Sequence, residues 1–355
     1  MRESSDAHDG ADEPPRTHAA GTGRARSGRP TMADVARAAG ISTALVSIVI
    51  RGVPGASDAT RRRVLQIADE LGYVPDQRAQ KLRQSRSRVL GVVFELQQPF
   101  HGDLVEHIYA AAARHGYEAM ISAVAPSRSE STAVNALLRE RCEAAILLGS
   151  GLAVEELARL ARRLPTLLVA RRADLPGVGA VRSDDTAGIG LAVDHLVALG
   201  HRRIAHIDGA GAPGSSDRRL GFLQAMARHG LQDSADVLAG GLTENAGAEG
   251  ARYLLDRPVP PTAVIAFNDR CATGVLDVLA RRGRDVPGDI SVVGYDDSRL
   301  AKIPHVQMTT VSQHAGRMAD AAVAAALDLI AGRTPEEAVL TPRLVERATT
   351  GPAPR

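Results

Sequence analysis

Basic side chains that could contact phosphate are concentrated near the beginning of the chain. Arg61, Arg62 and Arg63 stand at the start of a segment with helical periodicity that runs from Ser57 to Gly72. Positive charge at a helix N-terminus opposes the helix dipole, so phosphate contact explains these arginines better than helix stability does. Residues 31–88 hold ten Lys and Arg against five Asp and Glu, a net charge of +5, whereas the whole chain carries +2. This segment is therefore expected to bind a nucleic-acid backbone.

Two short helices are expected just before this basic helix. Thr31 and Asp34 have the spacing of a capping box, and the apolar residues at 32, 35, 36 and 39 fall on one face until Gly40. Ser42 begins a second helix whose residues 45, 46, 49 and 50 face the first. With residues 64, 67, 68 and 71 of the third helix they can enclose a small core. The layout is that of a helix-turn-helix, although any small helical hairpin shares it.

The rest of the chain carries acidic side chains at the ends of expected strands. From Val89 onward, short apolar runs alternate with amphipathic helices in two successive series, as in doubly wound parallel sheets. Acids at 184, 185, 296 and 297 follow such runs, where open sheets hold polar ligand groups. Two such units in series predict a ligand cleft between them. No Ser-His-Asp or Cys-His arrangement can be argued from spacing, so an enzyme has no support.

One glycine pattern could be mistaken for a nucleotide site. Gly209, Gly211 and Gly214 match G-x-G-x-x-G directly after an apolar run. Pro213 stands inside that turn, however, and no acidic residue ends a following strand about 20 residues on, as ribose recognition requires. We expect no nucleotide there and predict that the loop overhangs the cleft.

Composition indicates a globular protein of two or three domains. The chain has 355 residues, 44% of them apolar, and no run approaches the ~18 apolar residues of a membrane span. The first 30 residues lack the apolar segment of a signal peptide and are rich in Gly, Pro, Ser and charge, so we expect a disordered tail and a cytoplasmic location. Cys142, Cys271 and the scattered histidines predict no disulfide framework, no metal and no cofactor.

Several motifs, in this order, are similar to those of a known family. Residues 31–88 contain DVARAAGIS, VSIVIRG, ATRRRVLQIADELGYVPD and AQKLR, which resemble the headpiece and hinge of the lactose-repressor (LacI/GalR) family of bacterial transcription regulators. The likeness continues to about Thr349 through HGDLVEHIYAAAARHGY, LAVDHLVALGHRRIAHI, AVIAFNDRCATGVLDVL, DISVVGYDDS and MTTVSQ. It implies a small all-α helix-turn-helix headpiece and an α/β bilobed domain like that of periplasmic sugar-binding proteins, with two doubly wound parallel sheets.

The resemblance also implies domain boundaries. A tail at 1–30 would precede the DNA-binding headpiece at 31–75 and a hinge at 76–88. The N-lobe of the effector domain would comprise 89–200 with 315–331, the C-lobe 201–314 with 332–349, and 350–355 would form a second tail. The chain would thus cross between the lobes near Gly200, His314 and Gly332.

Residue by residue, the resemblance places DNA contacts in the headpiece and hinge. The implied residues are Thr31, Ser42, Thr43, Ala44, Ser47, Ile48, Arg51, Arg61, Arg78, Ala79 and Leu82. Leu82 matches the leucine that the family inserts into the minor groove at the operator centre. The segment 76–83 is expected to become helical only on DNA, because it is too short and charged to hold a helix alone.

Base recognition is where the sequence departs most from the family. The positions that usually read base edges are Thr43, Ala44 and Ile48, and the family has arginine at the last of these. Isoleucine cannot hydrogen-bond to guanine and can only pack on a group such as the thymine methyl. Arg51 replaces the usual asparagine and could contact a phosphate or guanine. The alternative is that Ile48 packs inward.

For the cleft, the resemblance implies a small effector, often a sugar or nucleobase. The implied contacts are Phe100, Asp184, Arg218, Asn268, Asp269, Asp296 and Gln313. Each has a structural alternative, such as surface charge for Arg218, a helix cap for Asp269 and plain core for Phe100. His101 and Arg219 stand where the family has an aromatic and a leucine, which makes the entrance more polar. Aromatics at only 3% offer few rings to stack on a sugar.

These observations favour a DNA-binding transcriptional regulator whose operator affinity a small effector modulates. A homodimer on a pseudo-palindromic operator is expected, because two-fold symmetry is mirrored by two half-sites. Repressor is favoured over activator by analogy. The alternative is a solute-binding protein without a DNA role, which the basic headpiece and the absent signal peptide argue against.

Overall fold

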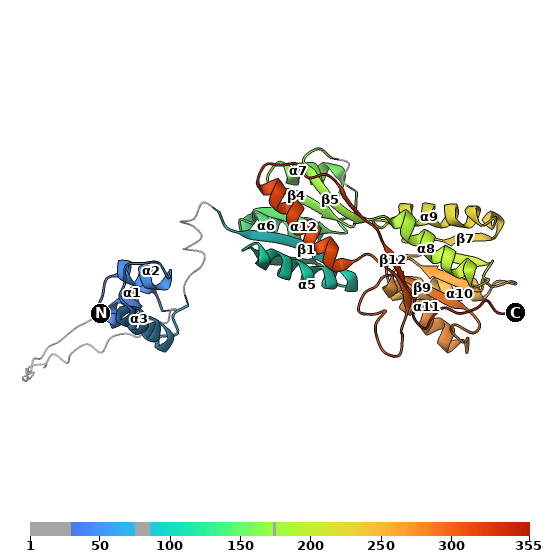
Figure 1. Cartoon of the computed structure of the whole chain (residues 1–355), viewed down its shortest axis with the longest axis horizontal. Helices are drawn as coiled ribbons and strands as arrows, with labels where there is room; N and C mark the ends of the chain where they lie inside the picture. Colours follow the sequence, from blue (N-terminus) through green and yellow to red (C-terminus); the bar gives the residue numbers. More distant parts are fainter. Residues whose placement is uncertain (1–29, 75–85, 173–174) are drawn as a thin grey trace, which may run out of the picture. The chain divides into compact units, whose positions relative to one another are not determined.

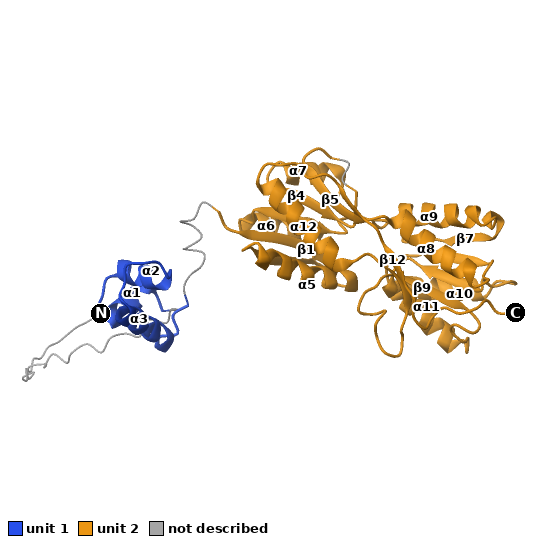
Figure 2. Cartoon of the chain, in the orientation of Figure 1, with its two compact units in different colours: residues 1–84 blue, residues 85–355 orange. Residues whose placement is uncertain are grey.

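The computed structural model describes residues 30–74, 86–172 and 175–355. They belong to two compact units, residues 1–84 and residues 85–355 (Figures 1 and 2). The expected tail up to residue 29 and most of the expected hinge, residues 76–85, lie outside the described residues.

The first unit is a three-helix domain. Its helices are α1 (Met32–Ala39), α2 (Thr43–Ile50) and α3 (Asp58–Glu70). Thr31, Ser42 and Ser57 cap them by accepting hydrogen bonds from backbone amides three residues on, and Thr31 with Asp34 forms the predicted capping box. The three predicted helix starts are confirmed.

A small core joins these three helices. Its buried members are Val35, Ala36, Ala39, Val46, Val49, Val64 and Ala68. Leu71, expected on the buried stripe, is 39% exposed instead, because α3 ends at Glu70 and the chain turns away through Gly72. The core is therefore carried by small and β-branched side chains.

The second unit contains two six-stranded sheets, each with helices on both faces. We call N-lobe the sheet of order β11-β5-β4-β3-β1-β2 with α5, α6, α7 and α12, and C-lobe the sheet of order β12-β10-β9-β8-β6-β7 with α8 to α11. Within the described residues, the strands of both sheets pair in parallel except for β12, which is antiparallel to β10. The predicted fold class, two doubly wound sheets behind an all-α headpiece, is confirmed.

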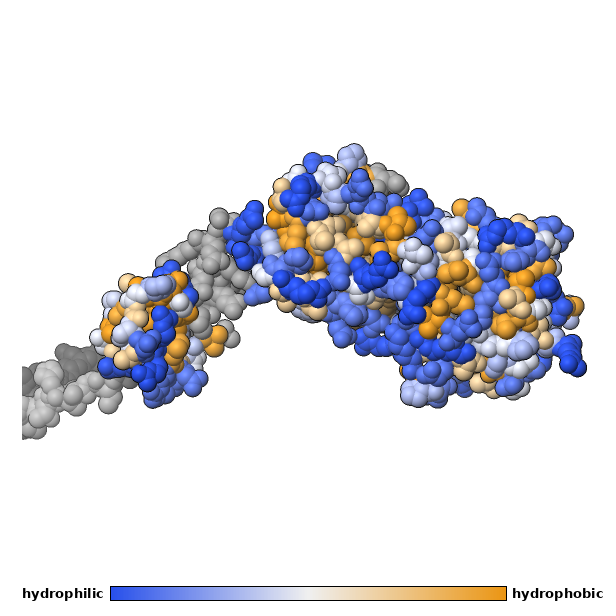
Figure 3. Space-filling model, viewed as in Figure 1, coloured by the Kyte–Doolittle hydropathy of each residue, from blue (hydrophilic) through white to orange (hydrophobic). Residues whose placement is uncertain are grey.

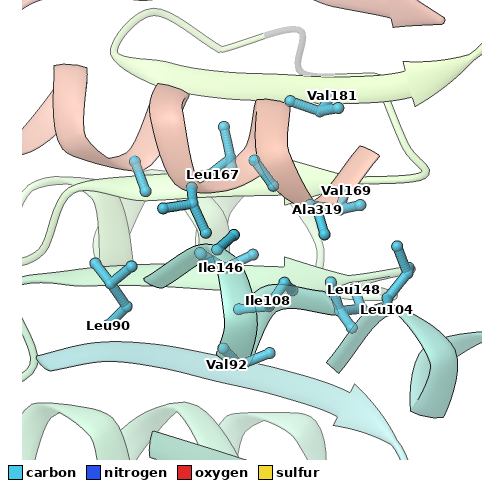
Figure 4. Close-up of a cluster of buried hydrophobic side chains, with 14 of the residues drawn as sticks. Leu90, Val92, Leu104, Ile108, Ile146, Leu148, Leu167, Val169, Val181 and Ala319 are labelled. Carbon is cyan, nitrogen blue, oxygen red and sulfur yellow. The ribbon is translucent and has the colours of Figure 1, made fainter. Parts of the chain in front are cut away.

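The four inner strands of the N-lobe sheet are buried on both faces, whereas the edge strands β2 and β11 are partly exposed. The strands are β1 (Val89–Glu95), β2 (Glu118–Val124), β3 (Ala144–Leu148), β4 (Thr166–Val169), β5 (Val178–Ser183) and β11 (Ala338–Leu340). The helices are α5 (Pro99–Arg114), α6 (Glu130–Arg139), α7 (Val154–Ala161) and α12 (Ala315–Ile330). Figure 4 shows one face, where Leu104 and Ile108 of α5 and Ala319 of α12 pack on Val92, Ile146 and neighbouring strand residues. Central parallel strands of this kind read as continuous apolar runs.

The C-lobe repeats this architecture. Its strands are β6 (Ile204–Ile207), β7 (Ala235–Leu238), β8 (Ala263–Ala266), β9 (Ser291–Asp296), β10 (Thr309–Ser312) and β12 (Arg343–Val345). Its helices are α8 (Asp185–Ala198), α9 (Ser215–Arg228), the 3-10 turn η1 (Gln232–Ser234), α10 (Glu244–Leu255) and α11 (Asp269–Arg281). One core lies under α10 and α11, and the other lies under α8 and α9.

Two of the three expected crossings between lobes are wrong. The first lies at residue 184, not near Gly200, because the apolar side of α8 packs with Phe222 and Tyr295 in the C-lobe core. The last lies at 341–342, not near Gly332, because β11 pairs with β5 in the N-lobe sheet. The middle crossing lies between Ser312 and Ala315. The expected lobe ranges must be shifted accordingly.

The last six residues do not form a free tail either. Gly351 is buried, its carbonyl accepts from the His201 ring 3.1 Å away, and its amide donates to the Ser291 hydroxyl at 3.1 Å. The amide of Ala353 donates to the Leu199 carbonyl at 2.9 Å. These bonds fasten the C-terminus to the C-lobe.

The surface of both units mixes apolar and hydrophilic residues, as Figure 3 shows for one face. Within the described ranges no single helix is long and apolar enough to cross a membrane; α1 and α2 pass that test only when taken together, across a 108° bend.

Candidate functional site

The start of α2 presents small side chains to solvent. Ser42, Thr43 and Ala44 are exposed, and Ser47 one turn later is half-buried. The Ser42 hydroxyl is committed to the helix, because it accepts from the amide of Leu45 at 3.2 Å. Thr31 is exposed too, and its hydroxyl donates to Asp34 at 2.6 Å. Thr43 and Ala44 are therefore the residues at this helix end whose side chains are exposed and not engaged in a cap.

Ile48 and Arg51 lie farther along the same helix. Ile48 is half-buried, and its Cγ2 atom lies 3.4 Å from the position that a Cβ atom on Gly55 would occupy. Ile48 packs against the loop between α2 and α3. Its side chain was expected to point away from the core, and it does so only in part. Arg51 is exposed, and its Nε donates to the Ser47 carbonyl at 3.1 Å. The free end of its guanidinium is available to a partner outside the headpiece.

Of the three arginines that open α3, the first has an internal role. Arg61 is half-buried, and its guanidinium donates to the carbonyls of Val53 at 3.1 Å and Val49 at 3.5 Å. It thereby ties α3 to the end of α2 and the loop between them. Arg62 and Arg63 are exposed, as phosphate contact requires. The expected contacts Arg78, Ala79 and Leu82 lie outside the described residues.

In the second unit, Arg218 lies at the centre of a buried polar cluster. Its side chain is only 5% exposed, and its Nε donates to Asp185 Oδ1 at 3.1 Å. Its Nη1 donates to the Phe267 carbonyl at 2.6 Å, and the guanidinium stacks 3.7 Å from the ring centroid of Tyr295. Burial of the Arg218 guanidinium is tolerated because it is paired with the Asp185 carboxylate. The alternative that Arg218 is only a charge on the exposed surface of a helix is therefore wrong.

Asp296 and Gln313 join this region from the ends of β9 and β10. Gln313 Nε2 donates to Asp296 Oδ1 at 2.7 Å. Asp296 has φ 114°, a backbone conformation that costs energy in a residue other than glycine and that is concentrated at functional sites. Burial raises the pKa of Asp296 well above its ordinary value, while the charge of Arg218 acts in the opposite direction. Arg218, Asp296 and Gln313 are thus brought together in the C-lobe.

The other predicted ligand residues have internal partners. Asp269 is fully buried and accepts from the Ser298 amide at 2.7 Å and the Thr310 hydroxyl at 2.6 Å. Asn268 caps α11, and Asp184 caps α8 by accepting from the Ala187 amide at 3.0 Å. Phe100 belongs to the N-lobe core. The alternative of plain core holds for Phe100, whereas the alternative of a helix cap is wrong for Asp269, because Asn268 is the cap residue.

A cavity of about 290 Å³ lies between the two lobes. The N-lobe contributes Val154, Leu157, Leu168, Ala170, Arg171, Arg172, Leu175 and Arg182, and the C-lobe contributes Asp185, Gly211, Ala212, Pro213, Gly214, Ser216 and Asp217. None of the seven predicted ligand residues lines it directly; Arg218 reaches it through Asp185. The loop 211–214 overhangs the space, as predicted.

Sequence reasoning missed the arginines of this cavity although a signal for them existed. Arg171 and Arg172 directly follow the apolar run PTLLVA, so they stand at a strand end as the chosen acids do. Arg182 lies in β5 and Asp217 in the first turn of α9. An arginine at a strand end indicates a contact to a polar ligand group just as a carboxylate there does.

Among the described residues, three pairs of side chains form hydrogen bonds between the lobes. Arg299, after β9, donates through Nε and Nη2 to Asp103 Oδ1 of α5, at 3.1 and 3.0 Å. Asn268 Nδ2 donates to Gln98 Oε1 at 3.4 Å, and Arg172 Nε donates to Asp217 Oδ2 at 3.2 Å at the cavity. The cavity is therefore held by residues of both lobes. Over the part of the chain that the structure describes, no group of three or more His, Cys, Asp or Glu side chains could hold a metal ion.

Two family models match this chain. Residues 31–76 match the bacterial regulatory proteins of the lacI family, and residues 193–350 match the periplasmic binding protein-like domain. The HTH-type transcriptional regulator DegA of Bacillus subtilis is 32% identical over 91% of this chain and 99% of its own length. The match to this one relative thus spans both the helix-turn-helix and the bilobed unit of this chain.

Solved structures agree with this assignment. A LacI transcriptional regulator from a Rhodococcus species is 70% identical, with a TM-score of 0.75 over 75% of this chain and 100% of that one. The lac repressor dimer bound to operator and the anti-inducer ONPF is 29% identical, with a TM-score of 0.77 over 91% and 100%. A CelR–cellobiose complex is 29% identical, with a TM-score of 0.66 over 90% and 100%. The chain belongs to the lacI family of bacterial regulatory proteins and is a helix-turn-helix transcriptional regulator.

Proposed function

We propose that this protein is a repressor that binds a pseudo-palindromic operator as a homodimer in the cytoplasm and responds to a small effector. The proposal rests on two features that occur together in this chain. One is a helix-turn-helix with exposed Thr43 and Ala44, and the other is a bilobed unit with a cavity between its lobes. One headpiece offers too little surface for tight specific binding, whereas two can contact two half-sites. The lac repressor relative is a dimer on its operator, which supports the same assembly here.

The effector would act by changing the relation of the lobes. It would bind in the cavity and contact both lobes, so its binding energy would depend on the orientation of one lobe relative to the other. Because coupling is reciprocal, an effector that loosens DNA binding must itself bind less tightly to the DNA complex. Arg218, Asp185, Asp296 and Gln313 support this role by forming one connected cluster beside the cavity.

The hinge role of residues 76–88 rests on the family likeness alone. We expect Leu82→Ala to weaken specific operator binding far more than non-specific binding, because a minor-groove wedge contributes only where the DNA can kink. Equal loss on both kinds of DNA would indicate a folding defect and would remove Leu82 from the interface.

A gel-shift experiment tests the proposal as a whole. The full chain should retard DNA from upstream of its own gene, with an affinity that falls steeply as salt rises. The variant Arg62→Gln/Arg63→Gln should bind more weakly with a shallower salt slope, while Arg159→Gln on α7 serves as control because Arg159 is exposed on the N-lobe. A protein that retards no DNA at low salt but binds a solute would support the solute-binding alternative. We propose no catalytic role.

A further inference from the structure

Among the described residues that line the cavity between the lobes, arginines outnumber acids. Three of the arginines at or beside it have carboxylate partners: Arg182 pairs with Glu337 at 2.8 Å, Arg172 with Asp217 at 3.2 Å, and Arg218 with Asp185 at 3.1 Å. These pairs neutralise both acids that line the cavity. The fourth arginine, Arg171, forms no ion pair with any residue that the structure describes.

Arg171 is held in place by uncharged groups. Its Nη1 donates to the carbonyl of Ser150 at 2.7 Å and to that of Leu152 at 2.9 Å. Both carbonyls lie in the segment that follows β3. A guanidinium carries five N–H donors, and two of the Arg171 donors are used here. Arg171 is half-buried and fixed by two carbonyls, and among the described residues no carboxylate compensates its positive charge.

The rest of the described lining is mostly small or aliphatic and does not favour a flat aromatic ligand. Among the described residues that line the cavity none is aromatic, so a nucleobase or sugar ring would find no ring to stack on. The C-lobe side is formed by the loop 211–214 and the first turn of α9, whose cap residue Gly214 supplies no side-chain oxygen to the helix amides. Asp185 offers a carboxylate that can accept from a ligand hydroxyl.

We propose that the effector is a small anion, a hydroxylated molecule with one carboxylate or phosphate group that binds Arg171. This inference rests on the proposed function, because it names the ligand of the same cavity. The anion would restore charge balance and form charge-assisted hydrogen bonds, which are roughly twice as strong as neutral ones. Its hydroxyl groups would donate to Asp185. At about 290 Å³ the cavity stands at the lower limit of small-molecule sites, so the ligand is of monosaccharide size.

Matched probes test the charge directly. Isothermal titration of the full chain would compare D-gluconate and D-glucose 6-phosphate with neutral D-glucose, which shares their hydroxyls. At least one anionic probe should bind on the order of tenfold more tightly than glucose, and the tighter of the two tells carboxylate from phosphate. Arg171→Gln should abolish this preference, Arg171→Lys should restore part of it, and Arg159→Gln should leave it unchanged.

The result that would overturn the inference is equally specific. Glucose binding as tightly as both anions, failure of both anions to bind, or an anion preference that persists in Arg171→Gln would each remove it. Operator binding without any probe is measured on the same samples. If the operator is retarded and only the anion preference fails, the proposed function stands and the ligand class is wrong.

Discussion

Arg299 of the C-lobe donates three hydrogen bonds to the Asp103 carboxylate of the N-lobe. The backbone amide of Arg299 lies 3.2 Å from Oδ2, and its Nε and Nη2 lie 3.1 and 3.0 Å from Oδ1. The Asp103 side chain is 19% exposed and that of Arg299 63% exposed. The pair joins α5 to the loop after β9. It is therefore a direct restraint on how the lobes are set.

Arg299→Ala should loosen the relation of the lobes. A partly exposed pair contributes about 1 kcal/mol, enough to shift a population without unfolding the chain. Small-angle X-ray scattering should show a larger radius of gyration for the variant than for the wild type. Arg281→Ala is the control, because Arg281 pairs with Asp277 inside α11. Identical scattering from both variants would mean that the Asp103 pair does not restrain the lobes.

Arg218→Ala should destabilise the second unit as well as abolish the effector response. Removing the guanidinium leaves the Asp185 carboxylate buried without a partner, which typically costs about 3–5 kcal/mol. The double variant Arg218→Ala/Asp185→Asn should recover part of that loss, as urea unfolding would show. Operator binding should persist in the double variant while the response stays absent. A single variant as stable as the wild type would contradict the pairing described here.

Acid should destabilise the C-lobe through a buried histidine. Burial lowers the pKa of His206 from 6.5 to about 4. Between pH 6.5 and 4 the unfolded chain takes up a proton that the folded chain does not, so the contribution present above pH 6.5 is lost as the pH falls. The upper bound is roughly 3 kcal/mol. His206→Phe, whose ring would lie beside Phe222, should lose less stability between pH 7 and 5 than the wild type.

The control for this experiment is His305→Gln, because His305 is exposed. Asp269 acts in the opposite sense: burial raises its pKa to about 7, so its contribution grows as the pH falls from 7 towards 4. The comparison of His206→Phe with wild type removes that background. Equal pH slopes in the two proteins would show that His206 is not buried in the neutral form.

Operator half-sites should show thymine or no strong preference at the base that faces Ile48. Isoleucine cannot hydrogen-bond, and here it is also half-buried against the loop at Gly55, which shortens its reach. Selection from randomised half-sites measures the preference. A dominant guanine at that position, surviving Arg51→Ala, would show that α2 does not read the DNA in this register.

What could be predicted from the sequence was the local order of elements. The capping residues Thr31, Ser42 and Ser57 fixed the helix starts, and apolar runs fixed the strands, because both signals depend on residues close in sequence. The crossings at 184 and 341–342 could not be placed in this way. Whether α8 packs on one lobe or the other depends on Phe222 and Tyr295, which lie far along the chain.

The same limit applies to the candidate site. Arg218 and Gln313 were found because they match family motifs, whereas the roles of Asp269 and Arg61 were set by partners that no motif records. Asp269 meets Ser298 and Thr310 only after β9 and β10 are paired side by side. Arg171 could not be predicted in this way, because its significance is an imbalance of charge that appears only when the partners of the neighbouring described acids are known.

The three connections between the lobes are very short. One residue separates β5 from α8, two separate β10 from α12, and two, Thr341 and Pro342, separate β11 from β12. Proline fixes its own φ, so the third connection has only three soft backbone torsions. Connections this short prevent one lobe from sliding along the other. The lobes can therefore move mainly by rotation about an axis near the connections, so a ligand that binds in the cavity would rotate one lobe relative to the other.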